Sequence, residues 1–136
     1  MKIDDSVALM PFDYQVDSVR RSVCVRYEGN FHFDEGLAIL NRTHTEGVGG
    51  YSMLYDLSYL TGNPTVEHMR RFIREELRST PLTESRGPIA VVAVDDDIYR
   101  MACAYEVLGR PRLRIKVFRE RAEAEMWLQQ RWPSLD

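Results

Sequence analysis

The chain has 136 residues, of which 44% are hydrophobic and 29% charged, a balance that is typical of one globular domain and excludes a disordered chain. A formal net charge of −3 argues against nucleic-acid binding, which needs a concentrated basic surface. The two cysteines have neither metal-ligand nor disulfide spacing, and no apolar stretch reaches membrane-spanning length. We therefore expect a cytoplasmic protein with no cofactor and no transmembrane segment.

The first third of the chain predicts an antiparallel hairpin followed by a helix. Apolar and polar side chains alternate from Phe12 to Val16 and again from Val23 to Tyr27, which is the period of half-buried strands. Asp34 can cap the helix that follows, and Gly47 ends it.

The middle of the chain predicts two interior strands separated by a helix. Tyr51 to Leu57 is apolar on both faces apart from Ser52 and Asp56, as expected of a strand that is covered on both sides. Thr65 can cap an amphipathic helix. The run Ile89 to Val94 is wholly apolar and rich in β-branched residues, and it is the strongest strand signal in the sequence.

The last third predicts a helix, an edge strand and a final helix. Acidic residues Asp95 to Asp97 begin the first of these helices, where the helix dipole favours negative charge. Apolar residues then alternate with Arg112, Arg114 and Lys116, which indicates an edge strand with one basic face. The final amphipathic helix begins at about Glu120.

This order of elements, β-β-α-β-α-β-α-β-α, predicts a single α/β domain over residues 1–136. We expect a mixed, mainly parallel sheet that is opened by an antiparallel hairpin and packed by amphipathic helices. The core spans about residues 12 to 130, and residues 1–10 are expected to be loosely ordered.

Several segments also resemble a known family. Tyr27-Glu28-Gly29-Asn30 closes the hairpin, Asp56-Leu57-Ser58 closes an interior strand, and Trp127-Leu128 lies in the last helix. From about Val16 to Leu128 the chain resembles the SpoIIAA-like branch of the STAS fold. The resemblance implies a small non-enzymatic module, whose better-known relatives are anti-sigma-factor antagonists that bind a partner kinase and are switched by serine phosphorylation. It makes Ser58 the candidate phosphorylation site.

The candidate binding site lies beyond the carboxyl ends of the strands, where open α/β sheets bind ligands. We expect a protein partner or a small ligand there, and the candidate residues are Asp56, Ser58, Thr61, Asn63, Asp95 and Tyr99. In the alternative interpretation, Asp56 bonds local backbone, Thr61 and Asn63 make a turn, and Asp95 caps a helix. Aromatic residues on the same elements, Tyr51, Tyr55, Tyr99 and Tyr105, would line a pocket or simply belong to the core.

Three other hypotheses come from different classes. An enzyme or a divalent-metal site would use Asp56 with Asp95 to Asp97, although no catalytic triad and no metal-ligand spacing is evident, so we assign no catalytic residue and no metal. A basic strip of Arg112, Arg114 and Lys116, beside Arg20 and Arg26 of the hairpin, would bind an acidic partner or a membrane surface, or would only protect an edge strand. The third hypothesis is a homodimeric structural module.

Overall fold

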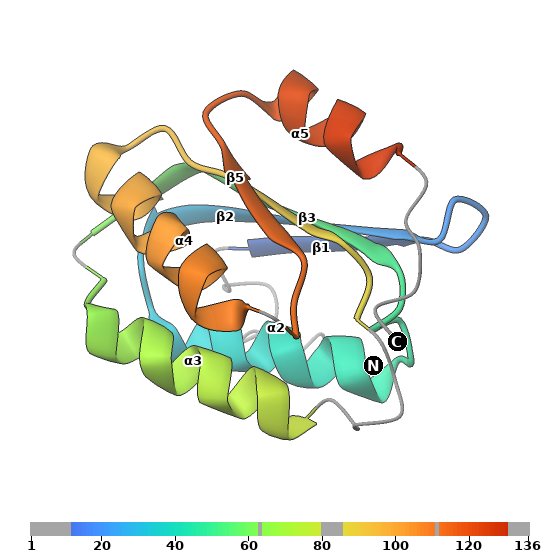
Figure 1. The fold of residues 1–136 in the computed structure, drawn as a ribbon, viewed down its shortest axis with the longest axis horizontal. Helices are drawn as coiled ribbons and strands as arrows, with labels where there is room; N and C mark the ends of the chain where they lie inside the picture. Colours follow the sequence, from blue (N-terminus) through green and yellow to red (C-terminus); the bar gives the residue numbers. More distant parts are fainter. Residues whose placement is uncertain (1–11, 63, 80–85, 111, 131–136) are drawn as a thin grey trace, which may run out of the picture.

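The computed structural model describes residues 12–62, 64–79, 86–110 and 112–130, and Figure 1 shows their fold. In these ranges the strands and helices follow the predicted order: β1 (Phe12–Asp17), β2 (Ser22–Asn30), α2 (Phe33–Thr45), β3 (Ser52–Thr61), α3 (Val66–Ser79), β4 (Ile89–Val92), α4 (Asp96–Gly109), β5 (Ile115–Phe118) and α5 (Arg121–Leu128). The α/β class is confirmed. Residues 1–10, expected to be loosely ordered, and the candidate site residue Asn63 lie outside the described residues.

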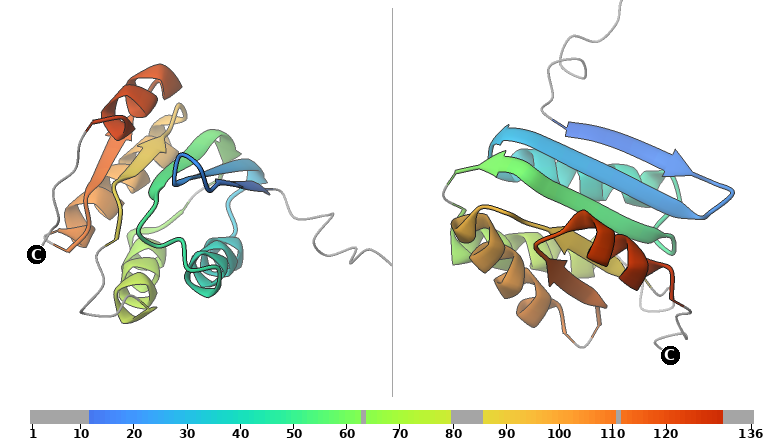
Figure 2. Two further views of the ribbon diagram at one scale, coloured as in Figure 1. Left: turned by 90° about the vertical axis from the view of Figure 1, so that its right-hand side faces the viewer. Right: turned by 90° about the horizontal axis from the view of Figure 1, so that it is seen from above.

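One sheet runs through the described part of the chain, with its five strands in the order β1-β2-β3-β4-β5. β1 pairs with β2 antiparallel and the other neighbours are parallel, which confirms the predicted mixed sheet opened by a hairpin. β3 and β4 are interior strands and β5 is an edge strand, as predicted (Figure 2). Because β2 to β5 run in one direction, their carboxyl ends meet at the same edge of the sheet.

Helices cover both faces of this sheet: α2, α3 and α4 lie on one face, and α5 lies on the other (Figure 1, Figure 2). The main core lies between the sheet and the three helices and includes Ile39 and Ile98. A second, smaller core lies under α5, where Ala124 is fully buried. Side chains of β3 alternate between the two cores, so Tyr55 belongs to the main core and Leu54 to the smaller one.

Three predicted boundaries are wrong, and continued strand pairing explains the first of them. β3 does not end at Leu57 but continues to Thr61, because it keeps pairing with β2 beyond a bulge. β4 is shorter than predicted and ends at Val92, and Val94 is already 54% exposed. Helix α2 begins one residue before Asp34, so Asp34 lies in its first turn and His32 occupies the N-cap position without a side-chain hydrogen bond. No helix in the described ranges is long and apolar enough to cross a membrane.

Candidate functional site

The buried carboxylate of Asp56 organises the outer side of the strand ends, on the face that α5 covers. It is 4% exposed, and its Oδ1 accepts hydrogen bonds from the backbone N–H of Ser58 at 3.0 Å and from the Ser58 hydroxyl at 2.6 Å. These bonds span the bulge of β3 between Asp56 and Tyr59. The alternative interpretation of Asp56, a carboxylate that bonds local backbone, is therefore what the structure shows.

A cation outside the predicted site residues completes this cluster. Arg121, the first residue of α5, donates from Nη1 to Asp56 Oδ2 at 3.2 Å and from Nε to Glu125 at 2.9 Å. Its Nη2 lies 3.6 Å from the sulfur of Cys24 on β2. Burial raises the pKa of the Cys24 thiol, and the Arg121 guanidinium only partly opposes this effect. The contacts of Arg121 therefore fasten α5 to β2 and β3.

The predicted phosphorylation site belongs to the same cluster. Ser58 is half-buried and donates its hydroxyl to the Asp56 carboxylate, so a phosphate at this position would place two negative groups together. Phosphorylation of Ser58 stays a prediction. The next candidate, Thr61, is exposed, and its hydroxyl lies 3.2 Å from the carbonyl oxygen of Gly29 and 3.1 Å from Asn30 Oδ1. Thr61 thus closes the pairing of β3 with β2 instead of making a turn.

The acidic candidates after β4 do not join Asp56. Asp95 is the N-cap of α4 and accepts from the backbone N–H groups of Asp97 at 2.9 Å and Ile98 at 3.1 Å, as the alternative interpretation predicted. Asp95 bonds the start of α4 and Asp56 bonds Arg121 of α5, and these two helices lie on opposite faces of the sheet (Figure 2). Within the described residues no three His, Cys, Asp or Glu side chains gather closely enough to hold a metal ion. The hypothesis of an enzyme or metal site built from these carboxylates has no geometric support there.

Two further candidates lie on the surface. Tyr99 is stacked by Arg119, whose Cζ lies 3.8 Å from the ring centroid, so its exposed side is occupied by a neighbouring cation. The prediction that Arg20 and Arg26 lie beside the basic strip of β5 is wrong, because β3 and β4 separate β2 from β5. The strip residues Arg112, Arg114 and Lys116 remain together before and within the edge strand.

An apolar cavity of about 80 Å³ lies at the same edge of the sheet, on the inner side, between the sheet and helices α2, α3 and α4. The strand-end segment lines it with Leu57, Leu60 and Pro64, so the apolar residues of this segment face the cavity while its polar residues face α5 or solvent. Six aromatic rings form much of the wall, those of Tyr27, Phe31, Phe33, Tyr55, Phe72 and Tyr105. The wall is almost wholly carbon. The structure thus identifies a site that the polar candidates did not reveal.

Small residues on two helices keep this space open. Gly36 of α2 and Ala102 of α4 both line the cavity. A Cβ on Gly36 would lie 3.2 Å from the ring of Phe72, so glycine lets α2 and α3 approach closely at this point. Larger side chains at either position would occupy the cavity or push its aromatic wall inward.

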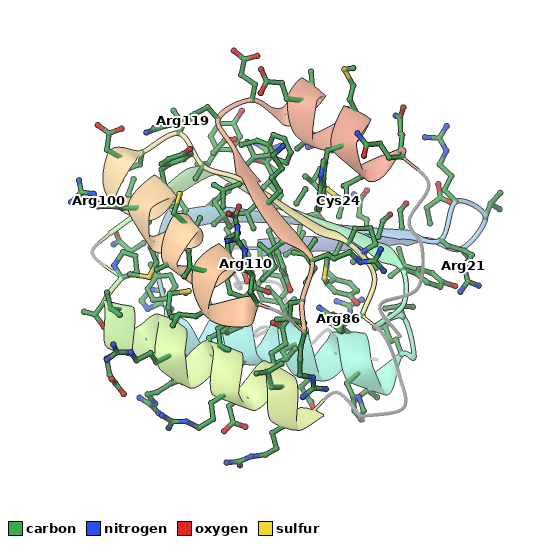
Figure 3. The ribbon with its side chains drawn as sticks, viewed as in Figure 1. Arg21, Cys24, Arg86, Arg100, Arg110 and Arg119 are labelled. Atoms are coloured by element: carbon green, nitrogen blue, oxygen red, sulfur yellow. The ribbon has the colours of Figure 1, made fainter. Side chains whose placement is uncertain are left out.

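Beyond the wall lies a buried polar cluster that comprises Glu76, Arg86, Tyr55 and Tyr105. Glu76 is 0% exposed and Arg86 5%, and Arg86 Nη2 lies 3.0 Å from Glu76 Oε1. The hydroxyl of Tyr105 lies 3.1 Å from Oε1 and 2.9 Å from Oε2 of the same carboxylate. Figure 3 shows Arg86 inside the molecule, whereas Arg100 extends from the start of α4 away from the body.

Burial and the charges of the cluster shift the pKa values of its two tyrosines and of Arg86. Burial raises the pKa of Tyr105 well above its usual value, and the Glu76 carboxylate raises it further. Burial and Glu76 also raise the pKa of Tyr55. For Arg86, burial lowers the pKa but the attraction of Glu76 outweighs it, so the guanidinium stays charged. Glu76 was not among the predicted site residues, although its place one helical turn after Phe72, on the buried stripe of α3, was a usable signal.

The fold is similar to that of known SpoIIAA-like proteins. An uncharacterised protein of the DUF3478 family with a SpoIIAA-like fold, from Shewanella loihica PV-4, superposes with a TM-score of 0.58 at 11% identity, over 94% of this chain and 98% of that one. The anti-sigma factor antagonist SpoIIAA is also similar: its unphosphorylated form has a TM-score of 0.48 at 16% identity, over 85% of this chain and 96% of that one. The phosphorylated form from Bacillus has a TM-score of 0.48 at 14% identity, over 86% and 100% of the two chains. No protein-family model and no curated protein matches the sequence.

The chain is therefore an α/β protein with a SpoIIAA-like fold. The family resemblance predicted from the sequence is confirmed at the level of the fold. The similarity to the Shewanella protein extends over nearly all of both chains.

Proposed function

We propose that this protein is a non-enzymatic binding module that takes a small, uncharged, apolar molecule into the cavity between the sheet and helices α2 to α4. The observation that carries the proposal is the cavity itself, whose wall is almost wholly carbon and which lies at the carboxyl ends of β2 to β4. This is the edge at which α/β proteins bind ligands. The strand-end residues Leu57, Leu60 and Pro64 then form one side of the binding site.

The chemistry of the wall selects the ligand. A charged group would lose its hydration on entering and would find no counter-ion among the described residues of the wall, so its transfer would be strongly unfavourable. Among these described residues, the titratable side chains are Tyr27, Tyr55 and Tyr105, and burial raises the pKa of each. Neutral tyrosines with raised pKa values make poor general bases at neutral pH, which supports a binding role over a catalytic one.

The size of the cavity adds a second restriction. An apolar cavity of ~150 Å³ stays dry and binds benzene, and this cavity, at about 80 Å³, is smaller. A single small ring or a short alkyl segment therefore enters only if side chains of the wall shift. Unbranched Met69 and Met101, which both line the cavity, are suited to such movement because methionine has several low-energy conformations.

A protein partner fits the outer side of the same segment. Tyr59 is 57% exposed, an unusual state for a large ring, and the Arg26 guanidinium covers one face of it at 4.3 Å from the ring centroid. Exposed aromatic residues next to arginine are typical of binding surfaces. The proposed module would therefore bind its ligand on the inner side of the strand ends and its protein partner on the outer side.

Ligand binding is tested with benzene as the probe, by nuclear magnetic resonance of methyl groups and by thermal unfolding. Benzene is expected to shift the Val91 and Ala102 methyl signals and to stabilise the protein, by ~2.7 kcal/mol where its concentration is 100 times Kd. Ala102→Leu, which fills the cavity, is expected to abolish both effects. The matched control is Ala104→Leu, because Ala104 lies on the same helix but outside the cavity wall. Equal binding by the two variants would contradict the proposal.

A further inference from the structure

One residue belongs both to the cavity and to the buried polar cluster. The ring of Tyr105 lines the cavity and packs edge-on against Phe72, with ring centroids 5.6 Å apart and an angle of 72° between the planes. Its hydroxyl donates to the fully buried Glu76. A ligand that pushes the ring aside must therefore also displace the hydroxyl from the carboxylate.

The cluster reaches the opposite edge of the sheet through Arg86. While Nη2 of Arg86 bonds Glu76, its Nη1 donates to the carbonyl oxygen of Gly49 at 3.3 Å. Gly49 precedes β3, at the amino end of the strand, whereas the cavity lies at its carboxyl end. The same carbonyl accepts the backbone N–H of Gly87 at 3.0 Å. The carbonyl oxygen of Gly49 thus accepts from both Arg86 and Gly87, and the longer hydrogen bond, from Arg86, is the weaker of the two.

The cluster also contains the donor for an alternative arrangement. The hydroxyl of Tyr55 is buried and makes no hydrogen bond of standard geometry within the described residues, and the same holds for Nε of Arg86. Besides burial, both charges of the pair act on Tyr55: the Glu76 carboxylate raises the pKa of its hydroxyl, and the Arg86 guanidinium lowers it. If Tyr105 leaves Glu76, Tyr55 can replace it as the donor, and Arg86 must turn to remain on the carboxylate. Two packings of one buried network are the kind of element that ligands switch.

We propose that occupancy of the cavity is transmitted through Tyr105, Glu76 and Arg86 to the turn at Gly49, on the opposite edge of the sheet. This inference rests on the proposed function, since it needs a ligand in the cavity. In the empty state Tyr105 bonds Glu76 and Arg86 holds Gly49. In the occupied state Tyr55 bonds Glu76, Arg86 leaves Gly49, and Gly87 keeps the carbonyl oxygen alone.

The test uses the backbone amide signal of Gly87 as the reporter and benzene as the probe, with the full chain labelled with ¹⁵N and ¹³C. In the wild type, benzene is expected to shift the Ala102 methyl signal and to move the Gly87 amide signal downfield as its hydrogen bond shortens. Glu76→Gln lies outside the cavity wall and removes the charge that Tyr105 and Arg86 both bond, so the Ala102 shift is expected to remain and the Gly87 shift to be lost. Glu75→Gln on the same helix is the matched control, because Glu75 is partly exposed and pairs with Arg78 instead, and it is expected to retain both shifts.

A second variant keeps the test decisive if Glu76→Gln does not fold. Arg86→Lys lies outside the cavity wall and keeps a positive charge beside Glu76 but removes the Nη1 that bonds Gly49, so it is expected to bind benzene and to lose the Gly87 shift. An Ala102 shift without a Gly87 shift in the wild type would overturn the transmission and leave the proposed function intact. A Gly87 shift that persists in either variant would do the same. The absence of any Ala102 shift in the wild type would overturn the proposed function and the transmission together.

Discussion

The buried pair of Glu76 and Arg86 gives the sharpest test of how this fold is held together. Replacing Arg86 with methionine removes the guanidinium that lies 3.0 Å from the carboxylate and also removes its bond to Gly49. Loss of one partner of a buried ion pair costs about 3–5 kcal/mol, because the remaining charge stays in a poorly solvated place. We expect Arg86→Met to lower the free energy of unfolding by that amount at pH 7.

Urea denaturation followed by circular dichroism measures this change, with Arg100→Met as the matched control. Arg100 also faces an acid, Asp97 at 3.3 Å, but its side chain is 78% exposed, so its loss is expected to cost less than about 0.5 kcal/mol. The double variant Glu76→Leu with Arg86→Met removes both charges and is expected to recover most of the loss.

A loss below about 1 kcal/mol for Arg86→Met at pH 7, or a double variant as unstable as the single one, would refute the argument that the buried pair requires both charges.

Three further predictions concern stability. Asp56→Ala removes the acceptor of three hydrogen bonds and is expected to lower the free energy of unfolding, measured with urea, by about 1–3 kcal/mol. This loss should exceed that of Ser58→Ala, which removes one donor, and equal losses would show that the carboxylate does not organise the bulge. Gly87→Ala would place a Cβ 2.2 Å from the carbonyl oxygen of Tyr51, so we expect it to lower the melting temperature sharply, and an unchanged melting temperature would show that these segments separate easily. Burial raises the pKa of four tyrosines, Tyr14, Tyr27, Tyr55 and Tyr105. The stability that they contribute is therefore fully present below about pH 10 and is lost as the pH rises further. Absorbance at alkaline pH should show these tyrosines ionising only on unfolding, and ionisation in the folded protein would contradict their burial.

Local chemistry was sufficient to predict most helix starts. Thr65 accepts the backbone N–H of His68 at 3.1 Å, and Asp95 caps α4, because both side chains bond groups only two or three residues away. Asp34 shows the limit of this reasoning: it resembles a cap in the sequence, yet the helix begins earlier, and its charge lies in the first turn instead.

The candidate site was predicted at the correct edge of the sheet but with the wrong side chains. Polar residues near the end of β3 indicated a ligand, yet Asp56 and Ser58 bond each other, and Arg121, which lies 65 positions away in the sequence, completes the cluster. The bulge after Asp56 changes which residues of the segment face inward, and a two-residue alternation cannot foresee it. Leu57 and Leu60 were therefore not among the predicted site residues, although they line the cavity.

The sequence by itself determined the class of the fold and the order of its elements, because hydrophobic period and helix caps depend on near neighbours along the chain. The apolar run from Ile89 to Val94 predicted an interior strand, and β4, which covers Ile89–Val92 of it, is one. Only the tertiary structure decided which distant groups meet: Arg121 with Asp56, Arg86 with Glu76, and the helices that leave a cavity around Tyr105. Such long-range contacts depend on how helices of given lengths pack across a sheet, and local sequence patterns do not predict that geometry.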